Sequence, residues 1–131
     1  TFWHSLEHIH DIKEVFSQVD FMLKKHGFLL IAIPNHDAYE RKVFFNDTWV
    51  AYDPPRHLYH FNTNAFERLL KKNKFIIEES YSMYQDTFFN ILMSSTNKNP
   101  IKLLYRVFLS IISISFNKKL SSSLLYICRK Q

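Results

Sequence analysis

Glycine and cysteine are nearly absent from this sequence, and each scarcity excludes a class of site. Gly27 is the only glycine in 131 residues, so the chain has no glycine-rich loop of the kind that lets a backbone approach a ligand closely. Cys128 is the only cysteine, which excludes an internal disulfide framework and a cysteine-based zinc cluster. This sparing use of cysteine fits a reducing compartment, and we expect a cytoplasmic protein.

Acidic residues are missing from the last third of the chain. Residues 1–86 contain 10 Lys and Arg and 12 Asp and Glu, whereas residues 87–131 contain 7 Lys and Arg and no acid. The formal net charge of +5 therefore belongs to the tail. Residues 101–119 mix basic and apolar side chains, which predicts either peripheral contact with a membrane or a stripe that covers the core or a substrate pocket. Nucleic acid is not an expected partner, because the basic residues alternate with aliphatic ones and form no reading motif.

Long hydrophobic runs are also missing. The most apolar stretch, residues 101–116, contains Lys102 and Arg106 and is too short and too polar to span a bilayer. The chain opens on the apolar Thr1-Phe2-Trp3 without Met or a charged leader, which indicates a fragment and not a signal peptide. With 47% hydrophobic and 17% aromatic residues, it should still form a packed core.

The spacing of apolar residues predicts alternating helices and strands. It indicates a helix over residues 11–26, with Gly27 as its left-handed C-cap, followed by a strand over 28–33 that is buried on both faces. A short helix within 37–48 and an extended loop over 49–59 come next. A capping box of Asn64 and Glu67 then opens a helix over 64–73, which a strand over 75–81 follows. The last two elements are a helix over 101–116 and a strand over 122–129. This order predicts an α/β sandwich.

Four segments, in this order, resemble the second half of a class I S-adenosylmethionine-dependent methyltransferase. They are "FWHSLEHIHD", "MLKKHGFLLIAIPN", "DPPRHLYHFNTNAFERLLKKNKF" and "SSSLLYICRK", and the third is similar to a subgroup related to ubiquinone-biosynthesis O-methyltransferases. The resemblance implies a Rossmann-like, mostly parallel seven-stranded sheet with helices on both faces, incomplete here because the chain resembles strands four to seven. Residues 1–131 would be the C-terminal part of a single methyltransferase domain, with a helical insertion over 98–121 before an antiparallel last strand.

The resemblance also implies a function. S-adenosylmethionine would be the cofactor, and its methyl group would pass to a small-molecule acceptor, for which we expect a hydroxyl oxygen. The family's glycine-rich cofactor loop follows its first strand and is missing here, so we expect this chain alone to be inactive. A non-catalytic remnant or a lipid-surface binding module on the same fold is the alternative. The oligomeric state is open.

Cofactor and substrate residues are expected where the strands end. By resemblance, Phe2, Trp3 and His4 lie at the mouth of the family's fourth strand, where the adenosine of the cofactor binds. Asn35 and His36 follow the next strand and point toward the same crevice by topology, because ligands bind at the carboxyl ends of such strands. They are expected to bind substrate, together with Tyr59 and with Trp49 as part of an aromatic wall.

The segment "PPRHLYHF" is the expected source of acid–base chemistry. His57 and His60 are the candidates to take a proton from a hydroxyl acceptor, and strand-like alternation would place His57 with Tyr59 and so favour His57. Arg56 could hold an acidic substrate or pin the loop to an acid such as Asp53. A lid held by hydrogen bonds, without proton transfer, is the alternative.

His4, Glu7 and His8 raise the question of a metal. The pattern His-x-x-Glu-His matches inverted zinc peptidases, which need both histidines on one helix and a third ligand from elsewhere. By resemblance, some quinone O-methyltransferases bind a divalent ion through Glu-x-x-Glu-His, and here His4 replaces the first Glu. The other interpretation, which we favour, is a loop whose side chains bond to the backbone, with no metal.

Overall fold

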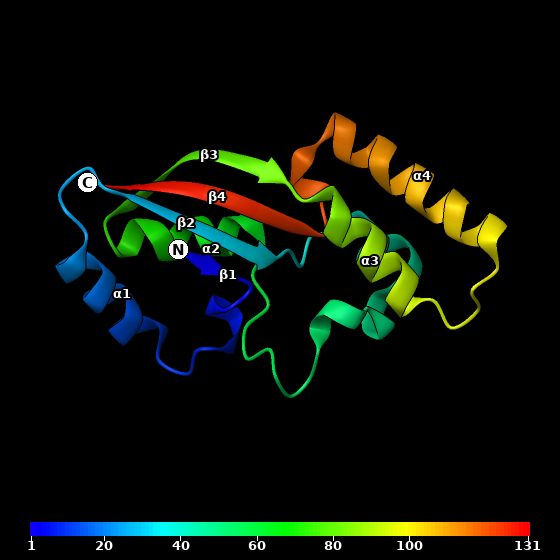
Figure 1. The fold of residues 1–131 in the computed structure, drawn as a ribbon, viewed down its shortest axis with the longest axis horizontal. Coiled ribbons are helices and arrows are strands. Elements are labelled where there is room, and N and C mark those ends of the chain that lie inside the picture. Colours follow the sequence, from blue (N-terminus) through cyan, green and yellow to red (C-terminus); the bar gives the residue numbers. More distant parts are fainter.

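The computed structural model describes residues 1–131 as four strands and four α-helices joined by shorter helical turns (Figure 1). The strands are β1 (Phe2–Trp3), β2 (Phe28–Pro34), β3 (Phe75–Ser82) and β4 (Ser123–Lys130). The helices are α1 (Ile12–Met22), α2 (Thr63–Lys72), α3 (Tyr84–Ser94) and α4 (Pro100–Phe116). Short turns are η1 (Leu6–His8), the π-helical η2 (Arg41–Phe45), η3 (Asn46–Thr48), η4 (Val50–Tyr52) and η5 (Lys118–Leu120). None of the helices is both long and apolar enough to cross a membrane.

The four strands form one sheet in the order β1-β2-β4-β3. β1 pairs with β2 in parallel, whereas β4 is antiparallel to both of its neighbours and places Ile127 opposite Leu30. β1, β2 and β3 therefore run in the same direction, and the last strand of the chain is inserted against them. This arrangement confirms the predicted α/β class and agrees with the last four strands of a Rossmann-like methyltransferase sheet.

The main core lies on the face of the sheet that α1 and α2 cover. Ile31 of β2 and its cross-strand partner Tyr126 of β4 point to this face and are buried. They belong to one cluster with Phe16 of α1 and Phe66 of α2, and the rings of Phe66 and Tyr126 are 4.8 Å apart. Leu125, which points to the opposite face, remains partly exposed. The two helices that this chain supplies to the sheet thus share one face.

α1 confirms the predicted first helix but is shorter. The Asp11 side chain accepts a hydrogen bond from the backbone N–H of Glu14 and so caps the first turn, and the helix ends at Met22. The residue in the left-handed conformation is His26 (φ 62°), so the prediction that Gly27 takes this role was wrong. Gly27 is needed for space, because a Cβ there would lie 2.8 Å from the carbonyl oxygen of Lys24.

α2 and β3 confirm the next two predicted elements, with a different cap. Asn62, and not Asn64, is the N-cap: its Oδ1 accepts a 2.8 Å hydrogen bond from the N–H of Ala65. At the other end, Lys74 itself has a positive φ of 64° where the chain turns into β3. The helix is therefore two residues out of register with the predicted capping box.

α3 was not predicted, and α4 was. The inward face of α3 is mostly polar, since Thr87, Asn90 and Ser94 are buried there beside Ile91. Asn90 donates a 2.6 Å hydrogen bond to Oγ of Ser122 just before β4. The sequence of α3 therefore lacks the regular apolar spacing that predicts a helix. α4 was predicted, and it starts within one residue of its expected position.

The segment between β2 and α2 folds around a second, smaller core. Ala38, Phe45, Trp49, Ala51 and Ile91 form it. The short helix predicted within residues 37–48 is present as the π-helical turn η2. The loop predicted to be extended over residues 49–59 instead begins with the helical turn η4, and its Pro54–Pro55 peptide bond is cis.

Candidate active site

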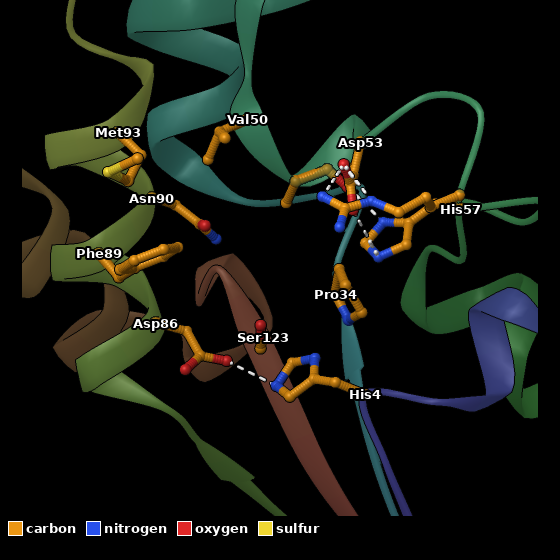
Figure 2. A pocket seen from close by; sticks show the side chains of 12 residues that line it. His4, Pro34, Val50, Asp53, His57, Asp86, Phe89, Asn90, Met93 and Ser123 are labelled. Atoms are coloured by element: carbon orange, nitrogen blue, oxygen red, sulfur yellow. Dashed lines mark hydrogen bonds and ion pairs between the residues drawn. The ribbon is translucent and has the colours of Figure 1, made fainter.

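A pocket of about 410 Å³ lies at the carboxyl ends of β1 and β2 (Figure 2). His4 directly follows β1, Pro34 is the last residue of β2, and Ser123 begins the antiparallel β4 at the same edge. In open α/β sheets, ligands bind in the crevice outside the carboxyl ends of the parallel strands. We therefore take this pocket as the candidate active site.

Two walls enclose the pocket beside the strand ends. One is α3, and the other is the turn and loop of residues 50–57, whose side chains face α3 across the opening in Figure 2. The lining residues are His4, Pro34, Val50, Ala51, Asp53, Arg56, His57, Asp86, Phe89, Asn90, Met93 and Ser123.

His4 joins the floor of the pocket to the α3 wall. Its Nε2 lies 2.9 Å from Oδ2 of Asp86, and its Nδ1 lies 3.5 Å from Oε1 of Glu7. These contacts, with Asp86 first and Glu7 second, raise the pKa of His4 to about 9, although burial opposes the rise. Burial alone would raise the pKa of Asp86, but bonding to His4 and Ser123 lowers it. At neutral pH the pair is therefore an imidazolium and a carboxylate.

His57 is oriented by the loop from which it comes. Its Nδ1 lies 2.8 Å from the carbonyl oxygen of Ala51. Because a carbonyl oxygen only accepts, Nδ1 carries the proton, and Nε2 of the neutral ring keeps its lone pair. Nε2 faces Oε1 of Glu7 and Oδ2 of Asp53, each at 3.9 Å. Nε2 is therefore the ring nitrogen that faces the two carboxylates and the pocket.

Arg56 pins the loop to Asp53. Its Nη2 lies 2.7 Å and its Nε 3.1 Å from Oδ1 of Asp53. The guanidinium lowers the pKa of Asp53, so this carboxylate is ionised at neutral pH. The geometry thus contains the loop contact that was one of the two alternatives for Arg56.

Glu7, His8 and His57 have the donor set for a divalent cation. One ligand atom from each lies within 4.8 Å of the others. Glu7 is 1% exposed, and the polar side chains nearest to its Oε1 are His4 at 3.5 Å and His57 at 3.9 Å. Nδ1 of His8 lies 2.9 Å from the carbonyl oxygen of Arg56, so both histidines donate their Nδ1–H to backbone carbonyls. Histidine ligands of metals are commonly fixed in this way, and an ion such as zinc would fit the N/O set.

The zinc-peptidase pattern is not formed. The turn η1 contains only Leu6–His8, and His4 precedes it with a positive φ of 45°. His4 contacts Asp86 while His8 bonds to the loop, so the two histidines do not share a helical face.

Most residues predicted to bind substrate lie outside this pocket, with Arg56 as the exception. Asn35 is buried and donates hydrogen bonds to the carbonyl oxygens of Lys119 (2.7 Å) and Ser121 (2.8 Å). Trp49 is buried in the second core. Both hold the chain around the pocket in shape and do not line it.

His36, Tyr59 and His60 lie in two neighbouring clusters. His36 Nε2 is 3.3 Å from the hydroxyl of Tyr52, and the ring of His60 packs at 5.1 Å from the ring of Tyr52. Tyr59 donates a 3.0 Å hydrogen bond to the carbonyl oxygen of His10 and lines a separate groove beside α1 and α2. The strand-like alternation expected for residues 57–60 was wrong, because this segment is not a strand.

The predicted cofactor residues differ in their surroundings. Phe2 packs against the main core, whereas Trp3 is 57% exposed beside it on the edge strand β1. Only His4 of the three lines the pocket.

Sequence reasoning missed the α3 wall. Asp86, Phe89, Asn90 and Met93 line the pocket, but α3 itself was not predicted. Spacing that includes small polar residues, such as Thr87, Asn90 and Ser94 with Ile91, is the signal that would have indicated a buried helix face.

The comparisons with known proteins identify the family of this chain. A family model described as "Methyltransferase domain" matches residues 1–80, which contain β1, β2, the loop with His57 and most of β3. No curated protein matches the chain. Because the match covers more than half of the sequence, this chain belongs to the methyltransferase-domain family.

Proposed function

We propose that this chain takes part in S-adenosylmethionine-dependent methyl transfer to a hydroxyl oxygen of a small-molecule acceptor. The supporting observation is the position of His57, which lines the strand-end pocket of a methyltransferase-family domain and bonds through Nδ1 to the carbonyl oxygen of Ala51, so that Nε2 is the ring nitrogen left for a proton acceptor. Transfer to oxygen needs such a group because the hydroxyl proton must leave as the new bond forms.

The chemical roles follow from the positions of the side chains. Bound S-adenosylmethionine supplies a methyl group on a positively charged sulfur. His57 would take the acceptor's hydroxyl proton at Nε2 as the methyl group is transferred. Glu7 and Asp53, whose carboxylate oxygens lie 3.9 Å from Nε2, would face the ring during this step. The loop and α3 exclude water and align the acceptor.

The chain offers part of the contacts that the cofactor needs. Trp3 is exposed at the end of β1 and presents an aromatic face suited to a purine ring. Gly27 precedes β2 and so lies at the opposite end of that strand from the pocket. No close backbone cradle is therefore formed at the pocket edge, and we propose that this chain alone holds the cofactor weakly or not at all.

The rim favours an acceptor with an apolar part. Phe89 and Met93 of α3 line the pocket and are at least half exposed, with Val50 on the opposite wall. Arg56 contacts Asp53 through Nε and Nη2, and this contact holds the loop at the rim.

A divalent cation is an alternative occupant of Nε2. An ion on Glu7, His8 and His57 would take the lone pair of His57. The ion would then polarise a hydroxyl acceptor directly, and His57 would not serve as a base. Nε2 of His57 can either bind the ion or accept the proton, but it cannot do both at once.

The test is calorimetric titration of S-adenosylhomocysteine into this chain and into a chain extended by coding sequence upstream of Thr1. We expect micromolar binding by the extended form and much weaker binding by residues 1–131. Absence of binding by both forms would overturn the proposal and favour a non-catalytic domain with the same fold.

A further inference from the structure

The outward side of α4 is its apolar side. The large apolar residues that this helix exposes recur at helical spacing, so they form one stripe. Leu104 is 71% exposed, Phe108 60% and Phe116 90%. The stripe, called the α4 stripe here, consists of Ile101, Leu104, Tyr105, Phe108, Ile111, Ile112 and Phe116.

The inward side of α4 is mixed in character. Ser110 and Ile114 are buried there, and Leu103 and Val107 pack against the second core. Arg106 donates a 2.8 Å hydrogen bond to Oγ of Ser95, and its guanidinium carbon lies 5.0 Å from the centre of the Phe45 ring. A surface helix normally turns its apolar stripe toward the core and its charges toward water. α4 has apolar residues on its exposed side as well, where Lys102 is the only charged residue, and this indicates that the exposed side meets an apolar medium.

The charged residues of α4 and of the segments that flank it in sequence are all positive. Lys98 and Lys102 lie at the start of α4, Lys118 and Lys119 follow its end, and residues 87–131 contain no Asp or Glu. A second copy packed on the stripe would bring these lysines toward one another. An anionic surface would neutralise them instead.

The position of α4 also bears on what could cover it. The turn η5 connects α4 to β4 and contacts β3, so the helix lies at the β3 and β4 side of the molecule (Figure 1). The open edge of the sheet belongs to β1, on the other side of β2. A strand that extended the sheet would therefore be added away from the α4 stripe.

We propose that α4 docks on an anionic lipid bilayer, lying in the plane of the interface with the α4 stripe among the acyl chains and the flanking lysines at the headgroups. A single helix of this length that cannot cross the membrane binds in this orientation when one face is apolar and its edges are basic. Phe88 and Phe89 of α3 are also exposed, and Phe89 lines the candidate active site. Docking would thus bring the pocket near the lipid phase, from which an amphiphilic acceptor could enter.

The experiment is flotation of the 131-residue chain with vesicles of phosphatidylcholine alone and with vesicles that contain roughly one third phosphatidylglycerol. We expect binding to the anionic vesicles, with a decrease at about 0.5 M salt because the electrostatic part is screened. The double variant L104S/F108S should reduce binding about tenfold or more. Its matched control is F21S, since Phe21 is 91% exposed on α1. Far-UV circular dichroism checks that both variants remain folded.

Charge is tested separately with the pair K102E/K119E and, as control, K24E/K25E near the end of α1. Only the first pair should weaken binding. Equal binding to neutral vesicles, equal losses in stripe and control variants, or no flotation would overturn the proposal. A concentration-dependent dimer in light scattering that disappears in L104S/F108S would also overturn it and identify a second copy as the occupant. Flotation does not depend on methyl transfer, so this inference and the proposed function can fail independently.

Discussion

The imidazole of His4 and the carboxylate of Asp86 meet at 2.9 Å and connect the end of β1 to α3 across the candidate active site. The contact joins two elements that the sequence places far apart, and it fixes the distance between the floor of the pocket and one wall. Oε1 of Glu7 lies 3.5 Å from Nδ1 of His4 and 3.9 Å from Nε2 of His57, so Glu7 lies between the two histidines. The pocket is therefore shaped by ionised groups whose state depends on pH.

The first prediction concerns that dependence. The pKa of His4 rises from 6.5 in the unfolded chain to about 9 in the folded one. A raised pKa stabilises the fold fully below the unfolded value, so this contribution is present below about pH 6.5 and is lost as the pH rises through about 9. We expect a loss on the order of 1 to 2 kcal/mol, because the site is partly exposed and screened.

Urea unfolding across this pH range measures the loss, and D86N should remove most of it. NMR titration of His4 in D86N should show a lower pKa than in the unchanged protein. H10A removes an exposed histidine and serves as control. If the stability of D86N follows the same pH curve as the parent, the His4–Asp86 pair does not stabilise the fold.

The second prediction concerns the base. H57A should lower kcat for methyl transfer to a hydroxyl by about 10²- to 10⁴-fold, the usual contribution of a positioned general base. H60A should have a much smaller effect, because His60 packs beside Tyr52 and does not line the pocket. Assays use the form that binds cofactor. An equal loss in both variants would favour a lid role over proton transfer.

The third prediction concerns metal ions. Zinc should bind through Glu7, His8 and His57 and should lower the rate of transfer, because it occupies the atom that accepts the proton. Chelator-treated protein should keep its full activity. E7Q should weaken zinc binding by about 10-fold or more, whereas H10A should not. Loss of activity on chelation, restored by a divalent ion, would show that the metal and not His57 activates the acceptor.

The fourth prediction distinguishes two candidate caps of α2. N62A removes the acceptor of the Ala65 N–H bond and should destabilise the fold by about 1 kcal/mol. N64A lies within the first turn and should change stability by less than about 0.5 kcal/mol. Thermal or urea unfolding of the two variants compares them directly, and the reverse order would restore Asn64 as the cap.

The fifth prediction concerns the only glycine. G27A would place a methyl group 2.8 Å from both the Lys24 carbonyl oxygen and Cγ of Leu23. The backbone must shift to relieve this contact, so we expect a loss of about 1 to 3 kcal/mol. H26G, at the neighbouring position with positive φ, should be neutral or stabilising. Unfolding of both variants tests whether space or conformation is limiting at this turn.

The fold was predictable where packing follows a simple repeat. β2 and α4 each contain a regular apolar pattern, and both were placed to within about a residue. α3 was not found, because Thr87, Asn90 and Ser94 pack through hydrogen bonds and small size. The turn after α1 and the N-cap of α2 depend on backbone angles that neighbouring residues can each adopt. His26, and not Gly27, has the positive φ, and Asn62, and not Asn64, caps α2.

The site was predictable only where its residues are close together in the sequence. The Pro-containing segment indicated a loop at the strand ends, and His57 and Arg56 do line the pocket. Their partners are tertiary: the carbonyl of Ala51 selects the tautomer of His57, and Asp86 comes from an element that had not been recognised. Residues such as Trp49 have the right chemistry for a binding wall, yet the fold uses them as core.

The place of β4 has a consequence for how the molecule assembles. It lies between β2 and β3, so these two strands have no partner in common until residues 123–130 are present. During synthesis, β4 is the last of the four strands to leave the ribosome, and the sheet cannot close before then. The long-range pairing makes the closing step slow relative to helix formation. Until that moment β3 has no partner strand and one edge of β2 is unpaired, and such exposed edges favour aggregation.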